Sequence, residues 1–247
     1  MLMRRKQAYE IPWPRRVSTP ADAVRFIDHV GFCALFPLNN VALPSLYYAV
    51  AKRPPTGWGK HAQLVWKWKD ELPRKRRAFY AKYFKGRGTF ISLNLLPHFL
   101  AMHGTGVAPT EAETFYETGR VSHDALELWQ ALAKHGPIAT LELRHACNME
   151  TQAGNKRFKK AMLELQGLLI VTHSGAEQET EAWASNRFDL VARVFSQQVA
   201  QAAKISAGDA RTAIAVKYRT LYPSASPVQM ARLFGWTKAQ AVTALAL

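Results

Sequence analysis

The chain has 247 residues, of which 48% are hydrophobic, and carries 33 Lys and Arg against 18 Asp and Glu, a formal net charge of +15 at pH 7. This composition excludes disorder over the whole length, and the excess of positive charge points to a polyanionic partner, because neutralising phosphates releases counterions. With only two cysteines, Cys33 and Cys147, a disulfide framework is excluded, and no Cys/His spacing typical of a zinc site occurs.

Both cysteines are expected to be buried free thiols in apolar helical surroundings. No apolar run approaches the roughly 18 residues that a membrane span needs. The first residues also lack the apolar core of a signal peptide. We therefore expect a protein of the cytoplasm that does not enter a membrane.

The first 16 residues form a basic, proline-containing arm. Such an arm could follow a DNA groove or be a disordered tail, and the sequence leaves both readings open. A helix is expected next, because Ser18 or Thr19 can cap it, Pro20 suits its first turn and Gly31 can end it. Residues 35–50 are apolar and aromatic but are interrupted by two prolines.

The most basic stretch, residues 58–88, interleaves cations with aromatic residues. Its pattern predicts two helices joined near Leu72 and Pro73. A short strand over 89–92 and an apolar helix over 93–102 should follow. Basic residues interleaved with aromatic ones suggest contact with phosphates and stacking of bases on the rings. For the aromatic residues the core is the favoured alternative to stacking, and we expect the cations to contact phosphates rather than merely face solvent.

A linker is expected over 103–118, followed by the second unit. This unit should contain helices over 122–134, 140–147 (capped by Thr140) and 155–166, and a brief strand at Ile138. A strand over 168–173, a turn over 174–177 and a return strand over 180–184 complete the pattern of a winged helix. The third helix begins with basic residues, as a recognition helix does. The wing is acidic, at Glu177, Glu179 and Glu181, and winged helices also bind proteins, so DNA contact by this unit stays open.

A third unit begins near residue 205 with a helix over 207–222, which Pro223 ends. Residues 226–242 then read as a helix-turn-helix, in which Ala231 allows close helix packing and Gly235 supplies the turn. The predicted fold class is therefore mainly α with small β-hairpins, built from tandem winged-helix and helix-turn-helix units. The units span residues 17–118, 119–203 and 204–247. Such units place a helix in the major groove of DNA.

No strong catalytic motif is present: there is no P-loop, GxGxxG, HExxH or GxSxG. The eight histidines are scattered, and no pair of them shares a helical face with a carboxylate at metal-ligand spacing. We expect no bound metal and no cofactor.

The segment Phe26–Val41 (FIDHVGFCALFPLNNV), together with the order of the units, resembles the bacterial winged-helix DNA glycosylases that excise alkylated bases and unhook interstrand crosslinks. In that family a helix ending in Gly leads into Gln-apolar-Gln or Gln-apolar-Asp, followed shortly by Asn. The resemblance implies that these polar side chains position the attacking water and stabilise the positively charged sugar.

Matching Gly31 and Asn39 to the family pattern places Ala34 and Phe36 at the two polar positions. Neither side chain can hold a water or offset oxocarbenium charge, so the resemblance implies loss of the family's hydrolysis. If the match is shifted, Asp28 is the nearest carboxylate that could substitute. The family's C-terminal β-barrel is not expected after the last helix, so we expect a shortened relative.

These observations favour a non-catalytic protein that binds double-stranded DNA, with a link to DNA damage recognition or repair. The alternatives are an active DNA glycosylase that excises alkylated bases, a sequence-specific transcription regulator and a protein-interaction scaffold. A monomer associated with the bacterial nucleoid is favoured. The cations expected to contact DNA are Arg15, Arg16, Arg74, Lys75, Arg76, Arg77, Lys82, Lys85, Arg87, Lys156, Arg157, Lys159, Lys160, Lys217, Arg219, Arg232 and Lys238.

Overall fold

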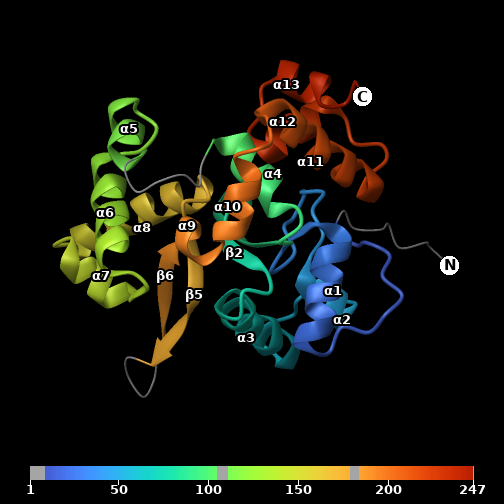
Figure 1. Ribbon diagram of the computed structural model, residues 1–247. Coiled ribbons are helices and arrows are strands. Elements are labelled where there is room, and N and C mark those ends of the chain that lie inside the picture. The colour runs from blue at the N-terminus through green and yellow to red at the C-terminus, as the bar shows by residue number, and fades with distance from the viewer. Residues whose placement is uncertain (1–8, 105–110, 179–183, 247) are drawn as a thin grey trace.

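The computed structural model describes residues 9–104, 111–178 and 184–246. It is mainly helical, with two small antiparallel sheets of three strands each (Figure 1). The coarse prediction of a mainly α protein with small β elements is thereby confirmed. None of the helices in these ranges combines the length and the apolar character needed to cross a bilayer.

The N-terminal part of the chain surrounds the first sheet with helices. Its elements are α1 (Pro20–Val30), β1 (Phe32–Ala34), α2 (Leu46–Ala51), α3 (Lys60–Arg74), β2 (Phe79–Lys82), the 3-10 turn η1 (Phe84–Gly86), β3 (Gly88–Ile91) and α4 (Leu96–His103). Thr19 caps α1 through a capping box with Asp22, and Gly31 ends the helix with a φ of 80°. Both signals were read correctly from the sequence. Cys33, expected in helical surroundings, lies instead in β1.

The basic stretch forms one helix and a strand, so the prediction of two helices joined near Pro73 is wrong. Pro73 lies inside the last turn of α3, and the chain then enters β2, whose first three residues are all buried. Phe79 faces one hydrophobic core and Tyr80 the other. Because both faces of β2 are buried, its residues do not alternate between apolar and polar. That alternation is the sequence pattern that would have predicted a strand.

The middle of the chain forms the second sheet and its helices. Its elements are α5 (Glu111–Glu117), α6 (His123–His135), β4 (Ile138–Ala139), α7 (Thr140–Ala146), α8 (Gln152–Gly167), β5 (Val171–Gln178) and β6 (Ala184–Leu190). Strand β5 packs beside α3 and β2, and in Figure 1 the far end of the β5–β6 ribbon extends beyond the helices of this middle part.

Several boundaries in this part differ from the expectations. The expected linker contains α5, and the expected turn at 174–177 lies within β5, where the pairing shifts between His173 and Gly175. The return strand begins at Ala184 rather than ending there. Thr140 does not cap α7; its hydroxyl donates instead to the carbonyl of Asn186, and Ala139 holds the cap position. Of the expected acidic wing, Glu179 and Glu181 lie outside the described residues.

The two sheets repeat one topology. Residues 20–91 and residues 123–190 each run helix, strand, helix, helix, strand, strand, apart from η1 in the first. In both sheets the last strand lies in the middle, giving the orders β1-β3-β2 and β4-β6-β5. The sequence analysis identified this order of elements only in the second unit.

The C-terminal part is entirely helical in its described residues. Its helices are α9 (Val191–Val194), α10 (Ser196–Ala202), α11 (Ala207–Leu221), α12 (Pro227–Phe234) and α13 (Lys238–Thr243). The predicted pair of helices with a tight turn is present: Ser226 caps α12 and Gly235 ends it in the left-handed region, with a φ of 72°.

One hydrophobic core joins the N-terminal and C-terminal parts. The ring of Phe32 in β1 lies 5.7 Å from that of Phe234 in α12 and 6.3 Å from that of Tyr218 in α11. Phe195 and Ala202, placed by the sequence analysis in the second unit, are buried in this same core. A second core lies under α1–α3, and a third fills the middle part around α6 and α8.

Candidate nucleic-acid interface

The segment after β1 forms one wall of a pocket of about 600 Å³. Strands β2 and β3 and the turn between them supply most of the opposite wall, and Trp66 of α3 completes it. The lining residues are Leu35, Phe36, Pro37, Leu38, Asn39, Val41, Trp66, Tyr80, Lys82, Lys85, Gly86, Arg87 and Gly88. The segment that carries the family resemblance therefore borders a sizeable pocket.

Neither Ala34 nor Phe36, the residues matched to the expected polar motif, has a polar side chain. Ala34 is completely buried and pairs with Thr89 in the sheet. Phe36 faces the pocket and packs on Tyr47 and Trp58, with ring centroids 5.6 and 6.4 Å apart. Neither residue can orient a water.

No carboxylate lines this pocket among the residues that the structure describes. Asp28, the carboxylate considered as a substitute, is exposed on α1 and is not part of the pocket wall. The described part of the pocket wall therefore offers no acidic group of the kind that hydrolysis of a glycosidic bond uses.

Three predicted cations line the pocket: Lys82 at the end of β2, and Lys85 and Arg87 on the β2–β3 turn. Lys85 adopts a left-handed conformation with a φ of 53°, and its Nζ donates to the backbone carbonyl of Arg232 at 2.9 Å. This bond fastens the turn to the last turn of α12, where the exposed carbonyl end of the helix dipole favours a cation.

A second pocket of about 500 Å³ adjoins the first, because Val41 and Lys85 line both. Gln229 and Arg232 of α12 line its far side. The two pockets together are called the basic groove below. It brings together four of the predicted cations: Lys82, Lys85, Arg87 and Arg232.

The structure places the other predicted cations outside this groove. Arg15 and Arg16 are exposed before α1, and Arg74–Arg77 are exposed at the end of α3, where Lys75 pairs with Glu71 at 2.7 Å. Lys238 is exposed at the start of α13, and Arg219 lines a different pocket, beside the C-terminal end of the chain.

Two predicted cations already have partners within the protein. The Nζ of Lys217 donates to the carbonyl of His29, which ties α11 to α1. Arg157, on the first turns of α8, donates to Asp124 of α6 with an Nε–Oδ1 distance of 3.0 Å. Its neighbours Lys156, Lys159 and Lys160 are exposed.

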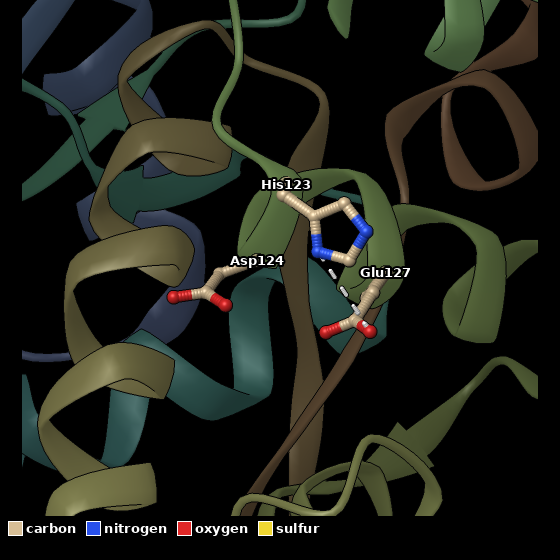
Figure 2. A group of neighbouring side chains, drawn as sticks. All are labelled: His123, Asp124 and Glu127. Atoms are coloured by element: carbon tan, nitrogen blue, oxygen red, sulfur yellow. Dashed lines mark ion pairs between the residues drawn. The ribbon is translucent and has the colours of Figure 1, made fainter.

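The described residues contain one group with metal-ligand geometry, His123, Asp124 and Glu127 on α6 (Figure 2). His123 and Glu127 lie 3.8 Å apart as an ion pair, a pairing of histidine and carboxylate four residues apart that the sequence analysis did not recognise. Arg157 binds Asp124 and lies 3.9 Å from Glu127. Arg157 therefore joins the two carboxylates in a surface ion-pair network and offsets part of their negative charge.

Sequence reasoning missed Trp66 and Tyr80 as groove residues. The spacing of Val65, Trp68 and Leu72 marks the buried face of α3, and Trp66 lies off that face, with 44% of its surface exposed. Helical periodicity would have revealed it. Tyr80 required knowledge of the strand, which the sequence did not predict.

Buried polar residues lie behind the groove floor. His173 packs edge-on against Tyr80, with ring centroids 4.9 Å apart, and within the described structure neither of its ring nitrogens has a hydrogen-bond partner. Burial, aided by Lys69 and Lys82, holds the pKa of His173 well below its usual value. Burial also lowers the pKa of Lys69, although Asp70 opposes this. Neither His173 nor Lys69 lines the pocket itself.

The sequence matches the model of a protein family described as AlkZ related, over residues 17–235. The match covers α1 to the end of α12, and thus every element of the basic groove. No curated protein and no solved structure matches the chain.

Proposed function

The chain belongs to the AlkZ-related family, a group related to a DNA-repair glycosylase, and on that premise we propose that it is a non-catalytic DNA-binding member. Double-stranded DNA would lie across the basic groove. The phosphates would contact Lys82, Lys85, Arg87 and Arg232, and the net charge of +15 would favour binding to any duplex.

We also propose that the two sheets and their helices are winged helices. The repeated order of elements and the shared strand order support this reading. In such a unit the third helix meets DNA, which would give Lys156, Lys159 and Lys160 of α8 a role in binding phosphates. The pair of helices α12 and α13 would be the third, wingless unit.

The observation that carries the non-catalytic reading is the chemistry of the pocket wall. Hydrolysis of a glycosidic bond needs a polar group that holds the attacking water and offsets the positive charge of the sugar. When Gly31 and Asn39 are matched to the family pattern, the buried Ala34 and the aromatic Phe36 fall at the two polar positions. The described pocket wall carries cations and no carboxylate. Cations would oppose an oxocarbenium ion rather than stabilise it.

The proposal can be tested with one duplex, prepared with and without 7-methylguanine. Binding is followed by fluorescence anisotropy across a salt series, and base release is measured in the same samples. We expect binding that weakens steeply as salt rises, and no release above background. Failure to bind either duplex at low salt would contradict the DNA-binding proposal.

Family membership itself favours a second candidate, an active glycosylase that uses residues outside the expected motif. Release of 7-methylguanine above background would establish it, and would overturn the argument from Ala34 and Phe36. An Asp28→Asn variant then identifies the group responsible. Loss of release in that variant would assign the chemistry to Asp28, and unchanged release would exclude it.

A further inference from the structure

Two tryptophans stand exposed beside the groove. Trp58 exposes 59% of its surface and Trp66 44%, and their rings form an edge-to-face pair with centroids 5.4 Å apart. Burying two rings of this size would add to the free energy of folding, so their exposure calls for an explanation. The fold does not need them inside, because the buried face of α3 is made by other residues.

The surroundings of Trp66 indicate the kind of partner. Its ring lines the same cavity as Lys82, Lys85 and Arg87, and no described residue brings a carboxylate to that cavity. Exposed aromatic rings beside a row of cations form the combination that binds unpaired nucleic acid, because bases stack on the rings while phosphates pair with the cations. An apolar protein partner would not require these cations.

The cavity is also of suitable size and support. Its volume of about 600 Å³ lies within the range of small-molecule sites, so it can admit a planar base between the Trp66 ring and the opposite wall. The ammonium of Lys69 lies over the Trp66 ring, 4.5 Å from its centroid. Trp58 packs edge-to-face against the same ring and also contacts Phe36. A ring held in this way loses little freedom when a base stacks on it.

We propose that Trp66, supported by Trp58, stacks on a DNA base that has left the double helix, so that the protein prefers duplexes containing an unpaired base. The inference rests on the DNA-binding function proposed above and adds the class of DNA that the groove selects. The preference arises because flipping a paired base costs unpairing and unstacking, whereas an already unpaired base avoids most of that cost.

The test compares two fluorescein-labelled hairpin duplexes that differ only by one unpaired adenine. Anisotropy titrations are made with the wild-type chain and with Trp66→Ala, Trp66→Phe and Tyr116→Ala. Tyr116, on α5, exposes 42% of its surface and does not line the groove, so its variant controls for removal of an exposed aromatic ring. Thermal unfolding of each variant shows that it is folded.

We expect the wild-type chain and Tyr116→Ala to bind the bulged duplex more tightly than the intact one. Trp66→Ala should abolish this preference, lowering affinity for the bulged duplex by about 5- to 100-fold and leaving the intact duplex unaffected, because stacking on an aromatic ring contributes on that scale. Trp66→Phe should retain part of the preference, since a ring remains. A 2-aminopurine at the unpaired position should lose fluorescence on binding to the wild-type chain but not to Trp66→Ala.

Equal affinity of the wild-type chain for the two duplexes would overturn the inference and leave the proposed DNA binding intact. An equal loss on both duplexes in Trp66→Ala would also overturn it, because Trp66 would then belong to a general binding surface. Absence of binding to either duplex at low salt would instead refute the proposed function, and would leave the tryptophans as a docking surface for another protein.

Discussion

Gly88 and Tyr80 meet so closely at the floor of the groove that no side chain fits between them. A Cβ added to Gly88 would lie 2.2 Å from the Tyr80 hydroxyl oxygen and 3.0 Å from the ring carbon that carries it. The ring cannot swing away, because it is 4% exposed and packed between Phe90 and His173. Glycine is required here for space and not for backbone freedom.

Gly88→Ala should therefore destabilise the fold by about 1–3 kcal/mol, the usual result of overpacking a filled core. Gly167→Ala is the matched control, because nothing lies within 4 Å of a Cβ built there. Urea unfolding of both variants measures the difference. If the two variants unfolded at the same urea concentration, the close contact of Gly88 with Tyr80 would not contribute to the free energy of unfolding.

His173 links the stability of the fold to pH. Its pKa is held well below the usual value by burial first, and then by Lys69 and Lys82, so the imidazole stays neutral in the fold. In the unfolded chain the same ring takes up a proton below a pH of about 6.5. The unfolded state then binds more protons, and the free energy of unfolding must fall as the pH drops below that value.

His173→Phe should remove this part of the pH dependence. The new ring fits among the same aromatic neighbours and brings no nitrogen that lacks a partner. We expect the advantage of the variant over the wild-type chain to grow between neutral and mildly acidic pH in urea titrations. His135→Phe, at the exposed end of α6, is the control. An advantage that did not change with pH would refute the assignment.

At the scale of elements, sequence reasoning succeeded where the ends of a helix carry their own signals. The end of α1 at Gly31 and the end of α12 at Gly235 were predicted, and the cap of α1 was narrowed to Ser18 or Thr19, of which Thr19 is the cap. Such signals depend on local hydrogen bonds and local backbone angles. It failed for the strand β2, whose identity depends on pairing with β3, an interaction that no local pattern encodes.

The candidate site was predictable only in part: the sequence showed its cations but not the groove that they share. Its cations were found because charge clusters are visible in a sequence, whereas the loss of the polar motif is a prediction that depends on matching Gly31 and Asn39. The sequence could not show which cations share one groove. That depends on the β2–β3 turn meeting α12, where the hydrogen bond from Lys85 to Arg232 joins residues 147 positions apart in the chain.

The turn between β2 and β3 makes a specific prediction about salt dependence. Replacing Lys82, Lys85 or Arg87 singly with Gln should weaken DNA binding and reduce the slope of log affinity against log salt by about 0.9 for each phosphate that is no longer neutralised. Lys204→Gln, an exposed cation after α10, serves as the control and should leave the slope unchanged. Equal slopes in all four variants would mean that the DNA lies elsewhere.

Across the whole molecule, the shared core makes the first sheet depend on the C-terminal helices. Phe32, Phe99 and Tyr218 surround Phe234, with ring centroids 5.7, 6.4 and 5.4 Å away. The first and third predicted units therefore share one core, whereas most of the second unit has a core of its own. We expect the N-terminal and C-terminal parts to unfold together.

Phe234→Ala should destabilise the fold by about 3–5 kcal/mol, through reduced burial and the cavity left behind. Hydrogen exchange should show weaker protection in β1 and α4 as well as in α12. Val242→Ala, at an exposed position of α13, is the control and should change little. Weaker protection confined to α12 and α13 would contradict the idea of one cooperative core.

The bond from Lys85 to Arg232 has a mechanical consequence. An ammonium has three N–H donors, and the helix carbonyl accepts only one of them, so Lys85 can grip a phosphate without releasing α12. The β2–β3 turn and α12, which lie on two sides of the basic groove, are thus joined before any DNA binds. We therefore expect the distance between the β2–β3 turn and α12 to be the same in the free protein and in its complex with DNA.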